Sequence, residues 1–204
     1  MDIDISKPAD NVLEFYVARS QAIAAYADVE RAMMVLLSSL LKTDIESAAI
    51  IFFRITNSKS RSEIIRSLLK KQFGTAYSHY WFGIHGTPNK RGLMSLIGEL
   101  DGKRNEIVHW HEADNINIEP GGTQTKLRTL IPPNFWQAST QSAITVGHLI
   151  TFRDKCFFVH DSISQFVLMI SEQTGYRLTP AWRDTFQSPC IWPPPQSHPL
   201  YKNS

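Results

Sequence analysis

Apolar residues recur at three- and four-residue steps along most of the chain, which is the period of an amphipathic helix. The first such run extends from about Pro8 to Lys42. Pro8 suits the first turn of a helix, because the amide hydrogen that proline lacks would have no partner there. At 1.5 Å per residue, this run of roughly 35 residues predicts a helix about 50 Å long.

Two capping-box patterns follow this first helix. Thr43 precedes Glu46 by three residues, and Ser60 precedes Glu63 by three residues. In such a pair, the hydroxyl and the carboxylate bond to free amides of a first helical turn. We therefore expect a second helix from Thr43 and a third from Ser60, with Gly74 ending the third.

The segment from Tyr77 to Gly86 is rich in aromatic residues and histidine. Aromatic side chains near basic residues can stack on nucleic-acid bases, but more often they cover a hydrophobic core. The sequence leaves both interpretations open.

A further helix is predicted from Thr87, as its cap, and Pro88, as its first residue, to about Trp110. Arg104 falls on its predicted buried stripe. That stripe consists otherwise of Leu93, Leu96, Ile97, Leu100, Ile107 and Val108. A second ridge, formed by Gly98, Gly102, Asn105 and His109, has no side chain in its first half. We expect room there for a ligand or for another backbone.

Beyond this helix the apolar period changes from helical to alternating, which predicts a β-hairpin over about 112–133. Lys126 and Arg128 would project from the same face of its second strand and form a clamp for a phosphate backbone. A last long helix is predicted from Ser142 to Gln173. We thus expect a mainly α domain over 1–175, followed by a Pro- and Trp-rich tail over 176–204 that is neither regular helix nor sheet and docks through its tryptophans.

The net charge of +2 does not by itself indicate nucleic-acid binding. Basic residues nevertheless gather between Arg54 and Arg104, either as a solvated face or as a phosphate-binding surface. Arg61, Lys70, Lys71 and Lys103 are the candidates within it for contacts to nucleic-acid phosphates. Two widely spaced cysteines predict free thiols. Without a signal peptide or a long apolar run, we expect a cytoplasmic protein that does not enter the membrane.

The chemistry concentrates in the stretch Lys103-Arg104-Asn105-Glu106-Ile107-Val108-His109-Trp110. A histidine can move a proton near neutral pH, and an arginine can hold phosphate oxygens with a bidentate fork. Asn105 lies four residues before His109 and could orient its ring. Arg104 and His109 lie about 140° apart around a helix, so they converge through the reach of the arginine or across a subunit contact. No metal-ligand spacing or cofactor fingerprint is present, so neither is expected.

This stretch resembles the signature of the HEPN superfamily, helical domains that include many metal-independent ribonucleases. The signature is an arginine, usually followed by Asn, Asp or His, and then a histidine after four to six residues, late in a helix of a four- or five-helix bundle. Arg104, Asn105 and His109 match it. Arg153 with His160 also fits the loose pattern, but there a structural role is favoured. Some toxin members have a tyrosine two residues after the histidine, where this chain has His111.

The resemblance implies an HEPN-like bundle of about five helices with the hairpin inserted in it. It also implies a metal-independent endoribonuclease, as a toxin or defence effector, with Arg104, Asn105 and His109 as catalytic residues. The alternatives are a non-catalytic HEPN module that binds RNA, nucleotide or a partner protein, and a purely structural helical dimer. RNA, a second copy docked through the motif helix, and an antitoxin or companion protein are the expected partners.

Overall fold

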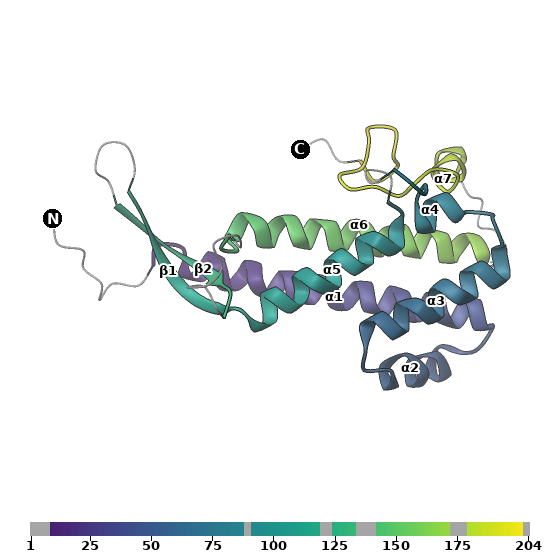
Figure 1. Cartoon of the computed structure of the whole chain (residues 1–204), viewed down its shortest axis with the longest axis horizontal. Coiled ribbons are helices and arrows are strands. Elements are labelled where there is room, and N and C mark those ends of the chain that lie inside the picture. The colour runs from purple at the N-terminus through teal and green to yellow at the C-terminus, as the bar shows by residue number, and fades with distance from the viewer. Residues whose placement is uncertain (1–8, 88–90, 119–123, 134–141, 172–178, 202–204) are drawn as a thin grey trace. The chain divides into compact units, whose positions relative to one another are not determined.

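The computed structural model describes residues 9–87, 91–118, 124–133, 142–171 and 179–201. The chain is mainly helical and carries one small two-stranded antiparallel hairpin, as predicted (Figure 1). The helices are α1 (Val12–Leu41), α2 (Ile45–Arg54), α3 (Ser58–Phe73), α4 (Ser78–Phe82), α5 (Leu93–His109), α6 (Val146–Ile170) and α7 (Pro180–Thr185). The strands are β1 (His111–Ile118) and β2 (Gln124–Ile131).

The caps predicted for α2 and α3 are wrong. The side chain of Asp44, not of Thr43, accepts the amide hydrogen bond of Ser47 at 2.8 Å, which lowers the pKa of Asp44. Asn57, not Ser60, caps α3 by accepting from the Ser60 amide at 3.2 Å. The main chain of Thr43 bonds back to the end of α1, because its amide donates to the Ser38 carbonyl at 3.1 Å and its carbonyl accepts from the Ser38 hydroxyl. Gly74 ends α3 with a positive φ of 60°, as predicted.

The motif helix α5 begins later than predicted. The Thr87 hydroxyl donates to the Ile84 carbonyl at 2.7 Å and does not cap the helix, and Pro88 lies outside the described residues. The helix starts at Leu93, directly after Gly92. A Cβ at Gly92 would lie 2.4–2.5 Å from main-chain atoms of residues 81–83, so only glycine permits this close approach.

The contacts between residues divide the chain into two units. Helices α1, α5 and α6 each contain residues of both units. Unit 1 comprises residues 1–26 and 102–154, and unit 2 comprises residues 27–101 and 155–204. In unit 1, the strands pair from His111 opposite Ile131 to Ile118 opposite Gln124. The buried Leu130 exchanges two main-chain hydrogen bonds with Ile144, at 2.9 and 2.8 Å. These bonds attach β2 to the segment that leads into α6.

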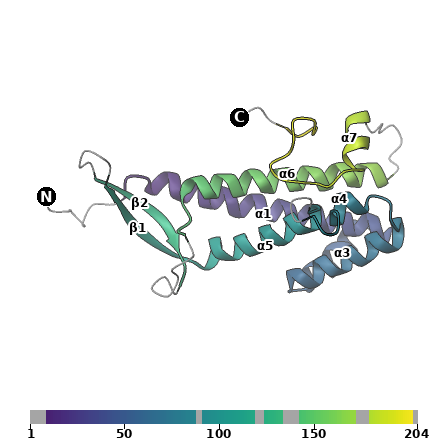
Figure 2. The same ribbon diagram turned by 45° about the horizontal axis from the view of Figure 1, so that its top comes forward.

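The core of unit 2 centres on Phe166 of α6. Its ring lies 4.9 Å from that of Trp81, 5.5 Å from that of Tyr77 and 5.4 Å from that of Phe186. Trp81 lies in α4, whereas Tyr77 directly precedes α4 and Phe186 directly follows α7. Figure 2 shows α4 and α7 at the C-terminal part of α6. The aromatic segment 77–86 therefore contributes Tyr77, Tyr80 and Trp81 to a hydrophobic core, one of its two predicted roles.

The prediction that the tail lacks regular helix is wrong, because α7 lies within it. Thr179 caps α7, and Pro180 occupies a first-turn position where its missing amide hydrogen costs nothing. The predicted docking is confirmed for the described residues, since Trp182, Phe186 and Cys190 are buried in unit 2. Across the described part of the chain, none of the helices has the length and apolarity to cross a bilayer.

Candidate functional site

Arg104 is half-buried on α5, as the predicted stripe requires. Its guanidinium carbon lies 5.6 Å from the centroid of the Tyr26 ring, and Nη1 donates to Oδ1 of Asn105 at 3.1 Å. Its Nε is buried without a hydrogen-bond partner. Among the residues that the structure describes, no carboxylate forms an ion pair with Arg104. Among the described residues, this guanidinium is therefore held by the neutral groups of Tyr26 and Asn105.

Asn105 and His109 are both exposed, toward the end of α5. Both side chains are described by the structure, and the predicted contact between them is not formed. Asn105 instead accepts the hydrogen bond of Arg104 and so orients the arginine. At Gly98 and at Gly102, an added Cβ would meet no heavy atom within 4 Å, which agrees with the expected room along this ridge.

Arg19 of α1 caps the C-terminus of the motif helix, and the sequence did not point to this role. Its Nε and Nη2 donate to the carbonyl of Ile107 at 3.2 and 3.0 Å, and Nη2 also reaches the carbonyl of Val108 at 3.5 Å. These carbonyls belong to the last turn, where no amide of the helix can reach them. A cationic group at this end is also favoured by the helix dipole.

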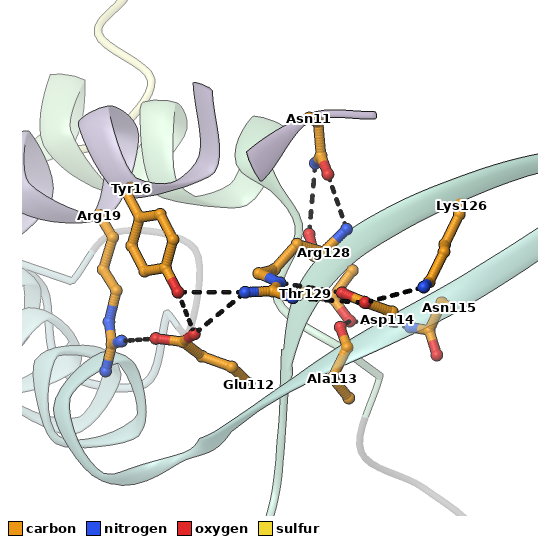
Figure 3. A network of polar contacts seen from close by, with 10 residues as sticks. All are labelled: Asn11, Tyr16, Arg19, Glu112, Ala113, Asp114, Asn115, Lys126, Arg128 and Thr129. Atoms are coloured by element: carbon orange, nitrogen blue, oxygen red, sulfur yellow. Dashed lines mark hydrogen bonds and ion pairs between the residues drawn. The ribbon is translucent and has the colours of Figure 1, made fainter. Parts of the chain in front are cut away.

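Glu112 of β1 holds Arg19 in place, as Figure 3 shows. Its Oε1 accepts from Nη1 of Arg19 at 2.6 Å, and its Oε2 accepts from the Tyr16 hydroxyl at 2.6 Å. The last turn of α5, the first half of α1 and the hairpin are thus joined through a single carboxylate. In the sequence, the only indication of this contact was an acidic residue shortly after the motif.

Lys126 and Arg128 project from one face of β2, as predicted, but their charges are engaged (Figure 3). Arg128 donates to both oxygens of Asp114, at 2.8 and 3.3 Å, and Nζ of Lys126 lies 3.4 Å from Asp114 Oδ2. The hydrogen bonds from Arg128 lower the pKa of the Asp114 carboxyl, and Asp114 in turn raises the pKa of Arg128. These two basic residues therefore stabilise the hairpin. To bind a phosphate backbone as predicted, they would first have to give up their bonds to Asp114.

Lys103 is also paired. Its ammonium forms an ion pair with Glu106 and lies 5.9 Å from the centroid of the Trp110 ring. In this pair Lys103 is exposed and Glu106 is half-buried. A surface pair that remains partly in water opens at little cost, so Lys103 stays available to an anion.

The other basic candidates lie in unit 2. Arg61 pairs with Glu30 at 2.7 Å, and its guanidinium lies 4.8 Å from the Phe52 ring centroid, so its charge is compensated within the fold. Lys70 and Lys71 are exposed in the last turn of α3. Lys70 lies 5.5 Å from the Phe82 ring centroid. Of these three, the two lysines remain accessible to a phosphate.

The second match to the motif differs in its surroundings. Arg153 donates to Asp154 at 2.9 and 3.0 Å and to Gln21 at 2.8 Å, and His160 contacts Asp161 at 2.9 Å. Each member is held by a neighbouring carboxylate, which fits the structural role favoured for it.

Cys156 and Cys190 are free, as predicted, and both are buried, which raises the pKa of each thiol to about 12. The described residues contain no group of three metal-ligating side chains.

The fold and this site define a mainly helical protein with a two-stranded hairpin, whose motif helix ends in an arginine, an asparagine and a histidine. Comparison with protein-family models, with curated proteins and with solved structures finds no match.

Proposed function

We propose that this protein is a metal-independent endoribonuclease of the HEPN type in which Arg104 and His109 act on the scissile phosphate. The observation that carries the proposal is the kind of partner that Arg104 has. Unit 1 contains four arginines within its described residues, and Arg19, Arg128 and Arg153 each pair with a carboxylate. Arg104 alone among them has neutral partners only. A half-buried cation without a counter-ion is costly, and an anionic ligand would offset that cost.

RNA brings its own nucleophile, so the protein has little covalent chemistry to perform. His109 takes the proton of the 2′-hydroxyl as the 2′-oxygen bonds to phosphorus, and the bond from phosphorus to the 5′-oxygen breaks. The leaving oxygen receives a proton from the imidazolium or from water. Arg104 stabilises the charge on the non-bridging oxygens. The products are a 2′,3′-cyclic phosphate and a 5′-hydroxyl end.

A second copy of the chain would complete this site. Arg104 and His109 lie about 140° apart around α5, whereas two copies of the helix facing each other across a two-fold axis supply two of each residue. The open space at Gly98 and Gly102 supports such an approach. In the toxin or defence role that the resemblance implies, an antitoxin or companion protein would control the dimer.

The experiment is an RNA cleavage assay in excess chelator. Arg104→Ala and His109→Ala are each expected to lower cleavage by at least about a hundredfold, the usual contribution of an acid–base or charge-stabilising group. His111→Ala is the matched control, because His111 is also exposed and lies two residues away. Cyclic phosphate ends are expected. Activity that requires a metal, or that survives His109→Ala, would refute the mechanism.

Mixing the two inactive variants tests the composite site. If residues from both copies form one site, subunit exchange between Arg104→Ala and His109→Ala restores part of the activity. RNA binding without cleavage by the wild-type protein would instead favour a non-catalytic HEPN module.

A further inference from the structure

Helix α2 presents apolar side chains on both of its sides. Ala48 and Phe52 are buried in unit 2, as expected for the inner face of an amphipathic helix. The outer positions are not polar, however. Ile50 is 66% exposed and Phe53 is 52% exposed. Contiguous exposed apolar side chains of this size mark sites that bind another surface.

The outer face of α2 also carries one acid and one base at equal distances from Ile50. Glu46 lies four residues before Ile50, and Arg54 lies four residues after it, so all three share one side of the helix with Phe53. Glu46 and Arg54 are both exposed, and neither forms an ion pair with any described residue. The face is thus an apolar centre with opposite charges at its two ends.

Such a face is complementary to itself. When two copies of α2 pack antiparallel about a two-fold axis at Ile50, Glu46 of each copy lies opposite Arg54 of the other copy. A two-fold contact requires this reciprocity, because residue i meets residue j and j meets i. The apolar centre is then removed from water, and the two ion pairs fix the antiparallel direction.

We propose that α2 is a homodimer interface, in which a second copy of this chain covers Ile50 and Phe53 and pairs Glu46 with Arg54 in both directions. The proposal is independent of the ribonuclease activity, because α2 carries none of the residues assigned to cleavage. It also differs from the contact expected through α5, whose open ridge offers glycines and polar side chains in place of apolar area.

The test is sedimentation of the full chain over a range of concentrations. Ile50→Asp is expected to weaken self-association by at least about tenfold, because it places a charge at the centre of an apolar contact. Leu13→Asp is the matched control, since Leu13 is even more exposed, at 79%, but lies on α1 in unit 1. Both positions are on the surface, so both variants should keep the helicity of the wild type.

Charge exchange tests the antiparallel arrangement. Glu46→Arg and Arg54→Glu should each weaken the homodimer, whereas the double variant Glu46→Arg/Arg54→Glu should regain it. A mixture of the two single variants should form heterodimers, because each like-charged pair becomes an opposite one. A wild-type protein that stays monomeric, self-association that Ile50→Asp leaves unchanged, or equal association of all the charge variants would overturn the proposal.

Discussion

The guanidinium of Arg19 donates two hydrogen bonds to the main-chain oxygen of Ile107, at 3.2 and 3.0 Å. The two residues are 88 positions apart in sequence, and the second lies two residues before His109. The turn that carries the proposed catalytic histidine is therefore closed by a side chain from α1.

Arg19→Ala should destabilise the fold by about 1.5–3 kcal/mol, the usual contribution of hydrogen bonds to a charged group. The carbonyls of Ile107 and Val108 then lose the hydrogen bonds that Arg19 donates. Urea denaturation of the variant and the wild type measures it. Arg19→Lys should recover only part of the difference, because one ammonium cannot span Ile107 and Glu112 as the guanidinium does. Equal stability of Arg19→Ala and wild type would contradict the cap.

The Asp114 carboxylate should stabilise the hairpin at neutral pH and lose this effect in acid. Its pKa in the folded state lies below the ordinary value of 3.8, mainly because Arg128 donates to it. A depressed folded pKa gives stability that is present above the unfolded pKa and is lost as the pH falls through the folded one. Asp114→Asn should therefore denature with a shallower pH dependence below about pH 4. Chemical denaturation at several pH values checks this, and an unchanged acid limb would contradict it.

His198 should make the protein sensitive to a milder acid range. Burial lowers the pKa of its imidazole to about 4, and its Nδ1 accepts the amide hydrogen bond of Leu200 at 3.1 Å. Between the unfolded pKa of about 6.5 and the folded one, the unfolded chain binds the extra proton, so stability falls as the pH falls, by up to about 1.4 kcal/mol per pH unit.

Replacing His198 by asparagine, which keeps an acceptor near the position of Nδ1, should flatten the stability profile in this range. His79→Asn, at an exposed position of the same unit, is the control and should leave the profile as it is. A wild-type profile that is flat from pH 6.5 to pH 4 would show that His198 titrates normally.

Lys70 and Lys71 should contribute to RNA affinity through phosphate contacts. In a His109→Ala background, affinity for single-stranded RNA should fall steeply with salt, with a slope of about −0.7 for each phosphate contacted. Reversing both charges to glutamate should reduce that slope by about two contacts. Lys59→Glu, at the exposed beginning of the same helix, serves as the positional control. A slope that none of these changes alters would assign the lysines to a solvated face.

The local features of the fold were readable from the sequence. The apolar period predicted α1, the end of α5 and the hairpin, because period and turn residues act over a few positions. Helix α1 begins at Val12, however, later than predicted. Gly74 ended α3 as expected, since its positive φ favours glycine. The docking of the tail followed from its tryptophans, although the helix within it did not.

Helix starts were less readable, because several side chains compete for one role. Thr43 and Asp44 both suit an N-cap. In the structure Asp44 takes this role, while the Thr43 carbonyl accepts a hydrogen bond from Ser38. In the same way, the Thr87 hydroxyl bonds to the Ile84 carbonyl, and α5 begins later, directly after Gly92.

The sequence by itself determined which side chains the motif helix carries and at what spacing. The tertiary structure decided which of the basic side chains pair with a carboxylate and which do not. Arg128 and Arg104 read alike as candidate phosphate ligands, but pairing across the hairpin places Asp114 against Arg128, whereas Tyr26 and Asn105 meet Arg104. Charge compensation depends on distances of a few ångströms between residues far apart in sequence, and only the folded chain sets those distances.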